Sequence, residues 1–326
     1  MPGKGHDHYV QIGREAVWGT DVAATRRFNV LATPEFGPIA GKVRSDVLTD
    51  QRTRPAIYAG PSLARCSFEL EAEFEGQLHL WDAAFGTATF GADGGTVTGS
   101  GTYTRTFILR ELINSYTLEA ITNIPSGKCD QIVGAKLNRL RFSGTPGLET
   151  PPCRLVTEWI GKTYSNNVTP TAGLSPNSPL PVMAGHVTTG TVDVGTADAA
   201  GTERLKSWEI TLDNKLVERF YGAATIDEPL TDDYAEQTVK WTMEFTSKTA
   251  IDEYLAHTQG TALLNFTSGT KQLQFQINKG YIVTPVGRPI DRWGIYTQEF
   301  TLEPIHDSVS VSGLAVVIVN AEATIS

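Results

Sequence analysis

The chain has 326 residues, which corresponds to about two domains of ordinary size. Its composition, 40% hydrophobic and 19% charged, is that of a packed globular protein and excludes a disordered chain. A net charge of −9 argues against a protein that grips nucleic acid, because such binding requires clustered cations on phosphates.

The cysteine content and the absence of long apolar runs point to a cytoplasmic site of synthesis. No run approaches the about 20 apolar residues that a bilayer span needs, and residues 1–8 lack the apolar core of a secretory signal. An odd, sparse set of cysteines is typical of a reducing compartment rather than a disulfide framework. The three are Cys66, Cys129 and Cys153.

Alternating apolar and polar residues dominate the first half of the chain. After an N-terminal arm (1–27), the segment from Phe68 to Phe74 places its apolar residues on one face and three glutamates on the other, which predicts a half-buried strand. A short helix is expected over Leu78–Phe85, followed by a Gly-rich loop or long hairpin tip over 86–102. We assign 28–162 to a first β-module.

The second half repeats this character. A Pro- and Gly-rich stretch over 163–204 is expected to be a linker, with a strand at 186–194. Residues 205–307 form a predicted second β-module with alternating strands near 239–245, 273–277 and 299–303 and a helix over 251–257. The tail, 308–326, is expected to add one more strand that covers the sheet edge of a neighbouring subunit. The predicted fold class is therefore mainly β, with two tandem β-sandwich or barrel modules and one short α-helix in each.

The two halves align with each other. Placing Phe68 on Val239 superposes two alternating strands, and both are followed by a short helix and a glycine. Further along, Gly134 falls on Gly294, with Leu140 on Phe300 and Phe142 on Leu302. Because alternating strands imitate one another, coincidence is the alternative to duplication. Duplication predicts two copies of one β-sandwich unit.

No catalytic or metal-binding motif emerges. His6 and His8 have the spacing of a metal pair but stand alone in the N-terminal arm, and the remaining histidines complete no zinc pattern. Nucleophile and phosphate-loop motifs are missing as well. Glu69, Glu71 and Glu73 are better explained as the wet face of a strand than as an acid/base pair. We therefore expect a structural protein without catalytic residues, metal or cofactor.

Two segments that precede the aligned strands carry opposite charge. Residues 41–65 hold five cations against two carboxylates, whereas 220–236 hold five carboxylates and no cation. Two solvated loops are one interpretation. In the other, the basic loop of one copy meets the acidic loop of another copy, since opposite potentials fix register in self-assembly. The candidate contact residues are Lys42, Arg44, Arg52, Arg54, Asp227, Glu228, Asp232 and Asp233.

The N-terminal motif Gly13-Arg-Glu15-Ala-Val-Trp18-Gly19-Thr20 resembles the lead-in of the tail tube proteins of long-tailed, non-contractile bacteriophages. The order of later segments is also similar: the strand, helix and glycine over 68–86, the run from 134 to 144, the strand 153–161 and the closing 299–304. The resemblance spans about residues 11–307. The Gly-rich 86–102 segment and the tail depart from it.

The resemblance implies a structural virion protein of the phage tail, made and assembled in the host cytoplasm. Its subunits form stacked rings around a lumen through which DNA passes without tight binding. Members with duplicated domains resemble trimers that mimic a sixfold ring, and a hexameric ring is the alternative. Implied partners are further copies of the chain and the tape measure, distal tail and tail terminator proteins. An acidic wall would repel DNA, and the candidates for it are Glu69, Glu71, Glu73, Thr242 and Glu244.

Three other functions remain open from the sequence. A β-sandwich binding module, carbohydrate-binding or adhesive, would expose aromatic platforms, whereas most tryptophans here fall on apolar faces or beside glycine turns. An enzyme on a β-scaffold is disfavoured by the missing motifs. The tube of a gene-transfer particle or of a tail-derived injection device shares every feature named above.

Overall fold

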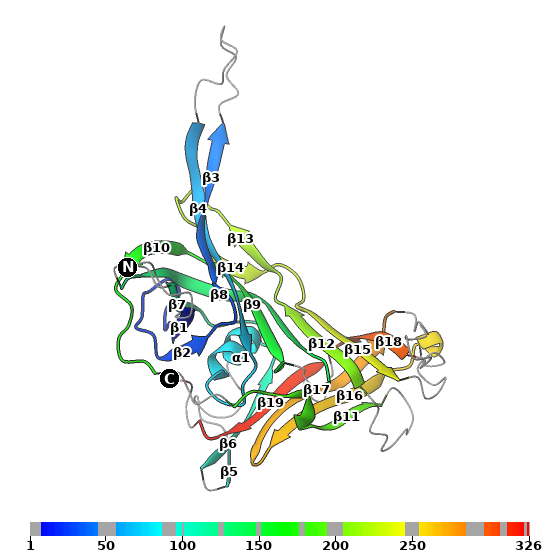
Figure 1. Ribbon diagram of the computed structural model, residues 1–326. Coiled ribbons are helices and arrows are strands. Elements are labelled where there is room, and N and C mark those ends of the chain that lie inside the picture. The colour runs from blue at the N-terminus through cyan, green and yellow to red at the C-terminus, as the bar shows by residue number, and fades with distance from the viewer. Residues whose placement is uncertain are drawn as a thin grey trace.

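A computed structural model describes residues 8–44, 57–86, 96–99, 101–122, 127–147, 151–175, 180–193, 205–244, 254–284, 297–306, 312–322 and 325. The chain is mainly β, which confirms the predicted fold class (Figure 1). The N-terminal unit contains β1 (His8–Arg14), β2 (Arg26–Asn29), β3 (Glu35–Arg44), β4 (Ile57–Glu71), α1 (Leu78–Phe85), β5 (Thr96–Gly99), β6 (Thr102–Ile108), β7 (Tyr116–Thr122), β8 (Cys129–Gly144), β9 (Arg154–Gly161) and β10 (Thr163–Val168).

The C-terminal unit has a similar series of strands and ends on the tail of the chain. Of the helix predicted over 251–257, residues 254–256 are helical, residue 257 is in a turn, and 251–253 lie outside the described residues. The elements are η1 (Ala184–His186), β11 (Val187–Asp193), β12 (Leu205–Asp213), β13 (Leu216–Arg219), β14 (Asp227–Thr231), β15 (Glu236–Glu244), β16 (Gly260–Ser268), β17 (Lys271–Ile282), β18 (Thr297–Pro304) and β19 (Leu314–Asn320).

The strand pairing of the N-terminal unit recurs in the C-terminal unit. In the first, β8 is long: its beginning pairs with β7 and β10, its end pairs with β9, and the series continues through β4 to β3. In the second, the beginning of β17 pairs with β16 and β19, its end pairs with β18, and the series continues through β15 to β12. The pairing of β1 with β7 in the first unit matches the pairing of β11 with β16 in the second. This repeated, non-local pattern supports duplication.

The pairing also corrects part of the sequence alignment. β8 corresponds to β17 and β9 to β18, so Leu140 and Phe142 on β8 do not correspond to Phe300 and Leu302 on β18. The error arose because consecutive strands share the same alternation, and only hydrogen-bonded partners distinguish them. Gly294 lies outside the described residues.

Alternation decides which side of each strand is buried. On β4, Phe68 and Leu70 are buried while Glu69 and Glu71 are half-buried on the opposite side. On β15, Trp241 is 1% exposed. Each residue type therefore lies where the period of two predicts.

The buried sides face each other across two layers. One layer is continuous from β3 through β4, β9, the end of β8, β12 and β15 to β18; the other contains β1, β7, β16 and β19. Phe142 on β8 packs on Phe275 of β17, with ring centroids 4.7 Å apart, and on Phe266 of β16 at 5.5 Å. Because β8 belongs to the N-terminal unit and β16 and β17 to the other, one hydrophobic core spans both.

Helix α1 confirms the prediction for Leu78–Phe85 and lies inside the molecule, with all eight residues buried (Figure 1). A helix this short is stabilised by packing rather than by propensity. Its one carboxylate, Asp82, is fully buried and accepts hydrogen bonds from Tyr116 Oη and from Asn114 Nδ2, the latter 2.8 Å long. The Gly-rich segment that follows includes β5, which pairs with β6 as one side of a hairpin.

The tail does not behave as predicted. β19 pairs with β17 on one side and with β6 on the other, so both of its edges are occupied within the chain. The expectation that the tail covers a neighbouring subunit's edge is therefore wrong for this strand. The segment 163–204, expected to be a linker, contributes β10 on β8 and β11 on β16, where the predicted strand at 186–194 lies.

Candidate assembly and lumen surfaces

The continuous layer has one solvent-facing side, which we call the polar face. Cross-strand register shows which residues share it: Glu71 lies opposite Arg154, Arg154 opposite Ser143, Ser143 opposite Glu209, and Glu209 opposite Lys240. This row crosses from the N-terminal unit to the C-terminal unit without interruption. The charged residues of the face are Glu35, Arg65, Glu69, Glu71, Arg139, Arg141, Arg154, Glu158, Glu209, Asp213, Glu236, Lys240, Glu244, Glu299 and Glu303.

Carboxylates outnumber cations on the polar face, ten to five. Several cations lie beside a carboxylate: Arg154 Nη1 is 2.8 Å from Glu69 Oε1, and Glu209 lies 3.9 Å from both Arg141 and Lys240. Exposed pairs of this kind contribute little to stability. Their consequence is electrostatic, because they neutralise positive charge on a surface that keeps a negative surplus.

Four of the five predicted lumen residues lie on the polar face, namely Glu69, Glu71, Thr242 and Glu244. Glu73 does not. It follows the end of β4, forms a bridge with Pro181, and its N–H donates to Gln77 Oε1 at 2.9 Å. Burial, together with the nearby Glu71, raises the pKa of Glu73 to about 7. From the sequence, no cation was assigned to this face. The alternation of Arg139 and Arg141 with the apolar Leu140 on β8 could have indicated that the two arginines lie on the solvent-facing side.

The two units are joined by direct strand pairing. β12 pairs with the end of β8 from Trp208 opposite Gly144 to Asp213 opposite Arg139. The indole of Trp208 lies against Gly144, where a Cβ atom would be 2.6 Å from Trp208 Cζ2. The strands that correspond to β12 and to the end of β8 lie at the two ends of the layer: β3 at one end and, paired with β18, the end of β17 at the other. In the described part of the chain, β3 has a strand partner, β4, on one side only.

The hairpin of β13 and β14 extends from the C-terminal unit onto the N-terminal unit. Lys136, 3% exposed, lies 2.6 Å from Glu228 and donates to the carbonyl of Pro229 at 3.3 Å. Arg65 forms an ion pair with Glu218. Beneath these charges lies a small apolar cluster of Leu63, Ile113, Ile160, Leu216 and Ile226.

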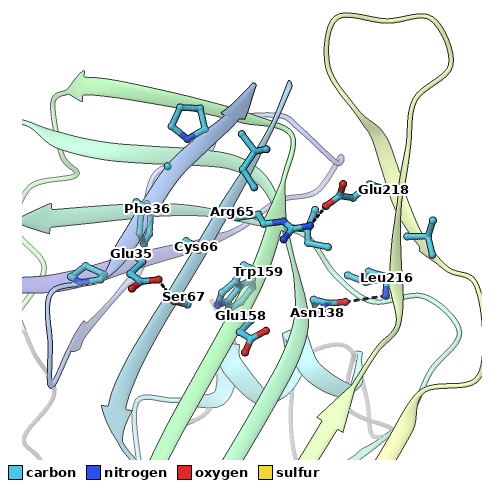
Figure 2. A pocket seen from close by; sticks show the side chains of 16 residues that line it. Glu35, Phe36, Arg65, Cys66, Ser67, Asn138, Glu158, Trp159, Leu216 and Glu218 are labelled. Atoms are coloured by element: carbon cyan, nitrogen blue, oxygen red, sulfur yellow. Dashed lines mark hydrogen bonds and ion pairs between the residues drawn. The ribbon is translucent and has the colours of Figure 1, made fainter. Parts of the chain in front are cut away.

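A groove of about 1090 Å³ lies between this hairpin and β3. Figure 2 shows Arg65 reaching Glu218 across it, and Asn138 accepting a hydrogen bond from the Leu216 N–H at 3.0 Å. On the β3 side, Ser67 donates to Glu35 at 3.3 Å. Among the described residues, no group of three His, Cys, Asp or Glu side chains is arranged to hold a metal ion.

The predicted contact residues divide between the two hairpins. Lys42 is exposed on β3, and the backbone of Arg44 ends that strand, while Arg52 and Arg54 lie outside the described residues. Asp227 and Glu228 begin β14, and Asp232 and Asp233 follow it. Because Glu228 binds Lys136 of its own chain, the acidic loop has a contact within the chain that the sequence interpretation did not include.

The N-terminal motif forms a buried hydrogen-bond network. The Glu15 carboxylate, 6% exposed, accepts from the N–H of Gly134 at 2.7 Å, the N–H of Gly19 at 2.8 Å and Thr117 Oγ1 at 3.0 Å. Trp18 Nε1 donates to the Gly134 carbonyl at 3.0 Å. The motif thereby ties the start of the chain to β7 and to the bend of β8.

Glycines in this network are required by space and by backbone conformation. Gly19 and Gly134 have φ values of +74° and +72°, which residues with a Cβ rarely adopt. A Cβ on either would lie within 3 Å of the Lys162 side chain, whose ammonium stands over the Trp18 ring. Gly13 is equally confined, since its Cβ would be 2.5 Å from the Ala23 carbonyl oxygen; Thr20 closes the turn by donating its N–H to Val17 at 3.1 Å.

These features define a mainly β protein with a charged sheet face, whose strand pairing repeats and whose β3 has one free edge among the described residues. The family model for phage tail tube proteins matches residues 5–304, nearly the whole chain. The chain belongs to the phage tail tube protein family, and its role is structural, in the tail of the virion. A comparison with curated proteins found no match. No helix among the described residues is both long and apolar enough to cross a membrane.

Proposed function

We propose that this chain forms stacked rings, three chains to a ring, and that the polar face lines the lumen through which DNA leaves the capsid. Each chain would fill two positions of a pseudo-sixfold ring. The observation that carries the proposal is the pairing of β12 with β8, which joins two copies of one unit side by side.

Because the two units have the same strand pairing, the junction between them within one chain predicts the contact between neighbouring chains. β3 corresponds to β12, and the end of β17 corresponds to the end of β8. The next junction would therefore pair β3 of one chain with the end of β17 in the neighbouring chain. An unpaired strand edge favours such pairing. A head-to-tail contact closes into a ring when the rotation that relates one chain to the next, applied repeatedly, completes one full turn.

The polar face supports the assignment of the lumen. Strand pairing across the ring would join the faces of all six units into one wall. Duplex DNA carries one charge per about 1.7 Å of its axis, so unpaired cations on this wall would bind it. A wall whose Arg154 and Arg141 lie beside carboxylates, with a negative surplus, lets DNA slide.

Disulfide trapping tests the ring contact. We expect a chain carrying Glu35→Cys and a differently tagged chain carrying Val283→Cys to form an interchain disulfide when mixed and oxidised, because the register of β12 on β8 places these two positions opposite each other. Ser165→Cys, on exposed β10, is the control partner for Glu35→Cys and should give no product. Mixed disulfides with Ser165→Cys at the same yield as with Val283→Cys, seen on non-reducing gels, would contradict the pairing.

Charge reversal tests the lumen. Particles carrying Glu71→Lys and Glu244→Lys should contain tubes of normal length but release DNA several-fold more slowly, because the added cations attract phosphates. The measurement is the time course of DNA release after receptor addition, with Asp21→Lys, an exposed reversal outside the polar face, as control. DNA release as fast as with the control variant would contradict the proposal that the polar face lines the lumen.

A further inference from the structure

The structure contains two hairpins at corresponding places, and only one of them is docked. The β13–β14 hairpin lies between β12 and β15 and packs on the N-terminal unit. The distal part of β3 and β4 corresponds to it, but runs out of the body as a two-stranded extension (Figure 1). This extension, which we call the β3–β4 arm, exposes Ile57 by 63% and Tyr58 by 60%.

The place where the docked hairpin binds has a counterpart on the C-terminal unit. The hairpin covers the middle of β4 at Leu63 and the end of β9 at Ile160, and Leu63 is 5% exposed. In the alignment of Phe68 with Val239, Tyr234 takes the place of Leu63, and it is 93% exposed. Tyr234 lines a groove of about 1020 Å³, together with Pro304 and Ile305 at the end of β18. We call it the C-terminal groove.

The charges at the two places are reversed. The docked hairpin brings the carboxylates of Glu218 and Glu228 to cations of the N-terminal unit. The arm has the opposite sign, since its described residues, 39–44 and 57–62, include the cations Lys42 and Arg44 and no carboxylate. The C-terminal groove also has the opposite sign, since four carboxylates line it against one arginine, Arg110. The carboxylates are those of Glu111, Asp232, Asp233 and Glu303. An arm that is basic thus corresponds to a groove that is acidic.

We propose that the β3–β4 arm of one chain binds in the C-terminal groove of a second copy of this chain. The contact rests on the proposed ring, because the chain whose β17 pairs with β3 is the one whose C-terminal groove the arm reaches. It repeats between chains what β13 and β14 do within one chain. Reversed charges give it specificity, since an arm facing the cations at Arg65 and Lys136 of an N-terminal unit would be repelled.

Disulfide trapping tests the contact directly. A chain with Tyr58→Cys and a differently tagged chain with Tyr234→Cys should form a mixed disulfide, whereas Tyr58→Cys with Ser165→Cys should not. Glu35→Cys with Val283→Cys reports the ring contact in parallel. If that pair crosslinks and Tyr58 with Tyr234 does not, the arm proposal is overturned while the ring stands. If neither pair crosslinks, both fail.

A charge swap provides the second test. Lys42→Glu alone and Asp232→Lys with Asp233→Lys should each raise the protein concentration needed for tube assembly by about fivefold, because each places like charges together. The chain that combines all three should return to within about twofold of the original. Lys128→Glu, an exposed reversal remote from the arm, is the matched control. Failure of the combined chain to recover, with monomers that melt as the original does, would overturn the proposal.

Discussion

Replacing Glu15 with glutamine should lower the free energy of unfolding by about 3 kcal/mol, because hydrogen bonds to a buried charged group contribute about 1.5–3 kcal/mol each. The carboxylate accepts three donors, two of them backbone N–H groups that are fixed in place. A glutamine has one acceptor oxygen and would direct its amide hydrogens at a donor. The buried N–H of Gly19 or Gly134 would then lose its acceptor.

Chemical denaturation of the monomeric chain, followed by tryptophan fluorescence, measures this loss. Glu218→Gln is the matched control, since Glu218 forms an exposed pair with Arg65 and its loss should cost less than about 1 kcal/mol. Equal midpoints for the two variants would show that the N-terminal motif does not hold the sheet as described.

Replacing Phe142 with alanine should cost about 3–5 kcal/mol, the usual cost of removing a buried aromatic ring. Phe142 is fully buried, lies on β8 of the N-terminal unit, and packs on Phe266 and Phe275 of the C-terminal unit. Because one core spans both units, the variant should still unfold in a single transition at a lower temperature.

Calorimetry of the variant distinguishes one core from two. Val156→Ala on the polar face is the control and should change stability by less than about 1 kcal/mol. A variant that shows two separated transitions, one at the original temperature, would mean that the units fold independently and that Phe142 belongs to only one core.

The local sequence pattern predicted the strands and the helix that are defined by the spacing of neighbouring residues. The alternation of Phe68 and Leu70 with glutamates identified β4 and its polar side, and the spacing of Leu78, Trp81 and Phe85 identified α1. The lead-in motif identified the family, although the sequence did not indicate that Glu15 is the centre of a hydrogen-bond network.

Pairing partners were beyond the reach of the pattern. The structure shows that β19 pairs with β6 of its own chain. The sequence of β19 predicts an apolar strand, but its residue pattern is the same whether the strand pairs within its own chain or with a neighbouring chain. The same holds for β8, which changes partners along its length at a bend made possible by Gly134. Long-range register depends on which edges the finished fold leaves open, and that is a property of the whole sheet.

Electron microscopy of the assembled protein tests the central idea most directly, that one chain supplies two neighbouring positions of a ring. Image averages of rings at subnanometre detail should show six similar units made by three chains, with the charged sheet face turned inward. Rings of six chains, or a lumen lined by the β1 and β7 layer, would contradict the account.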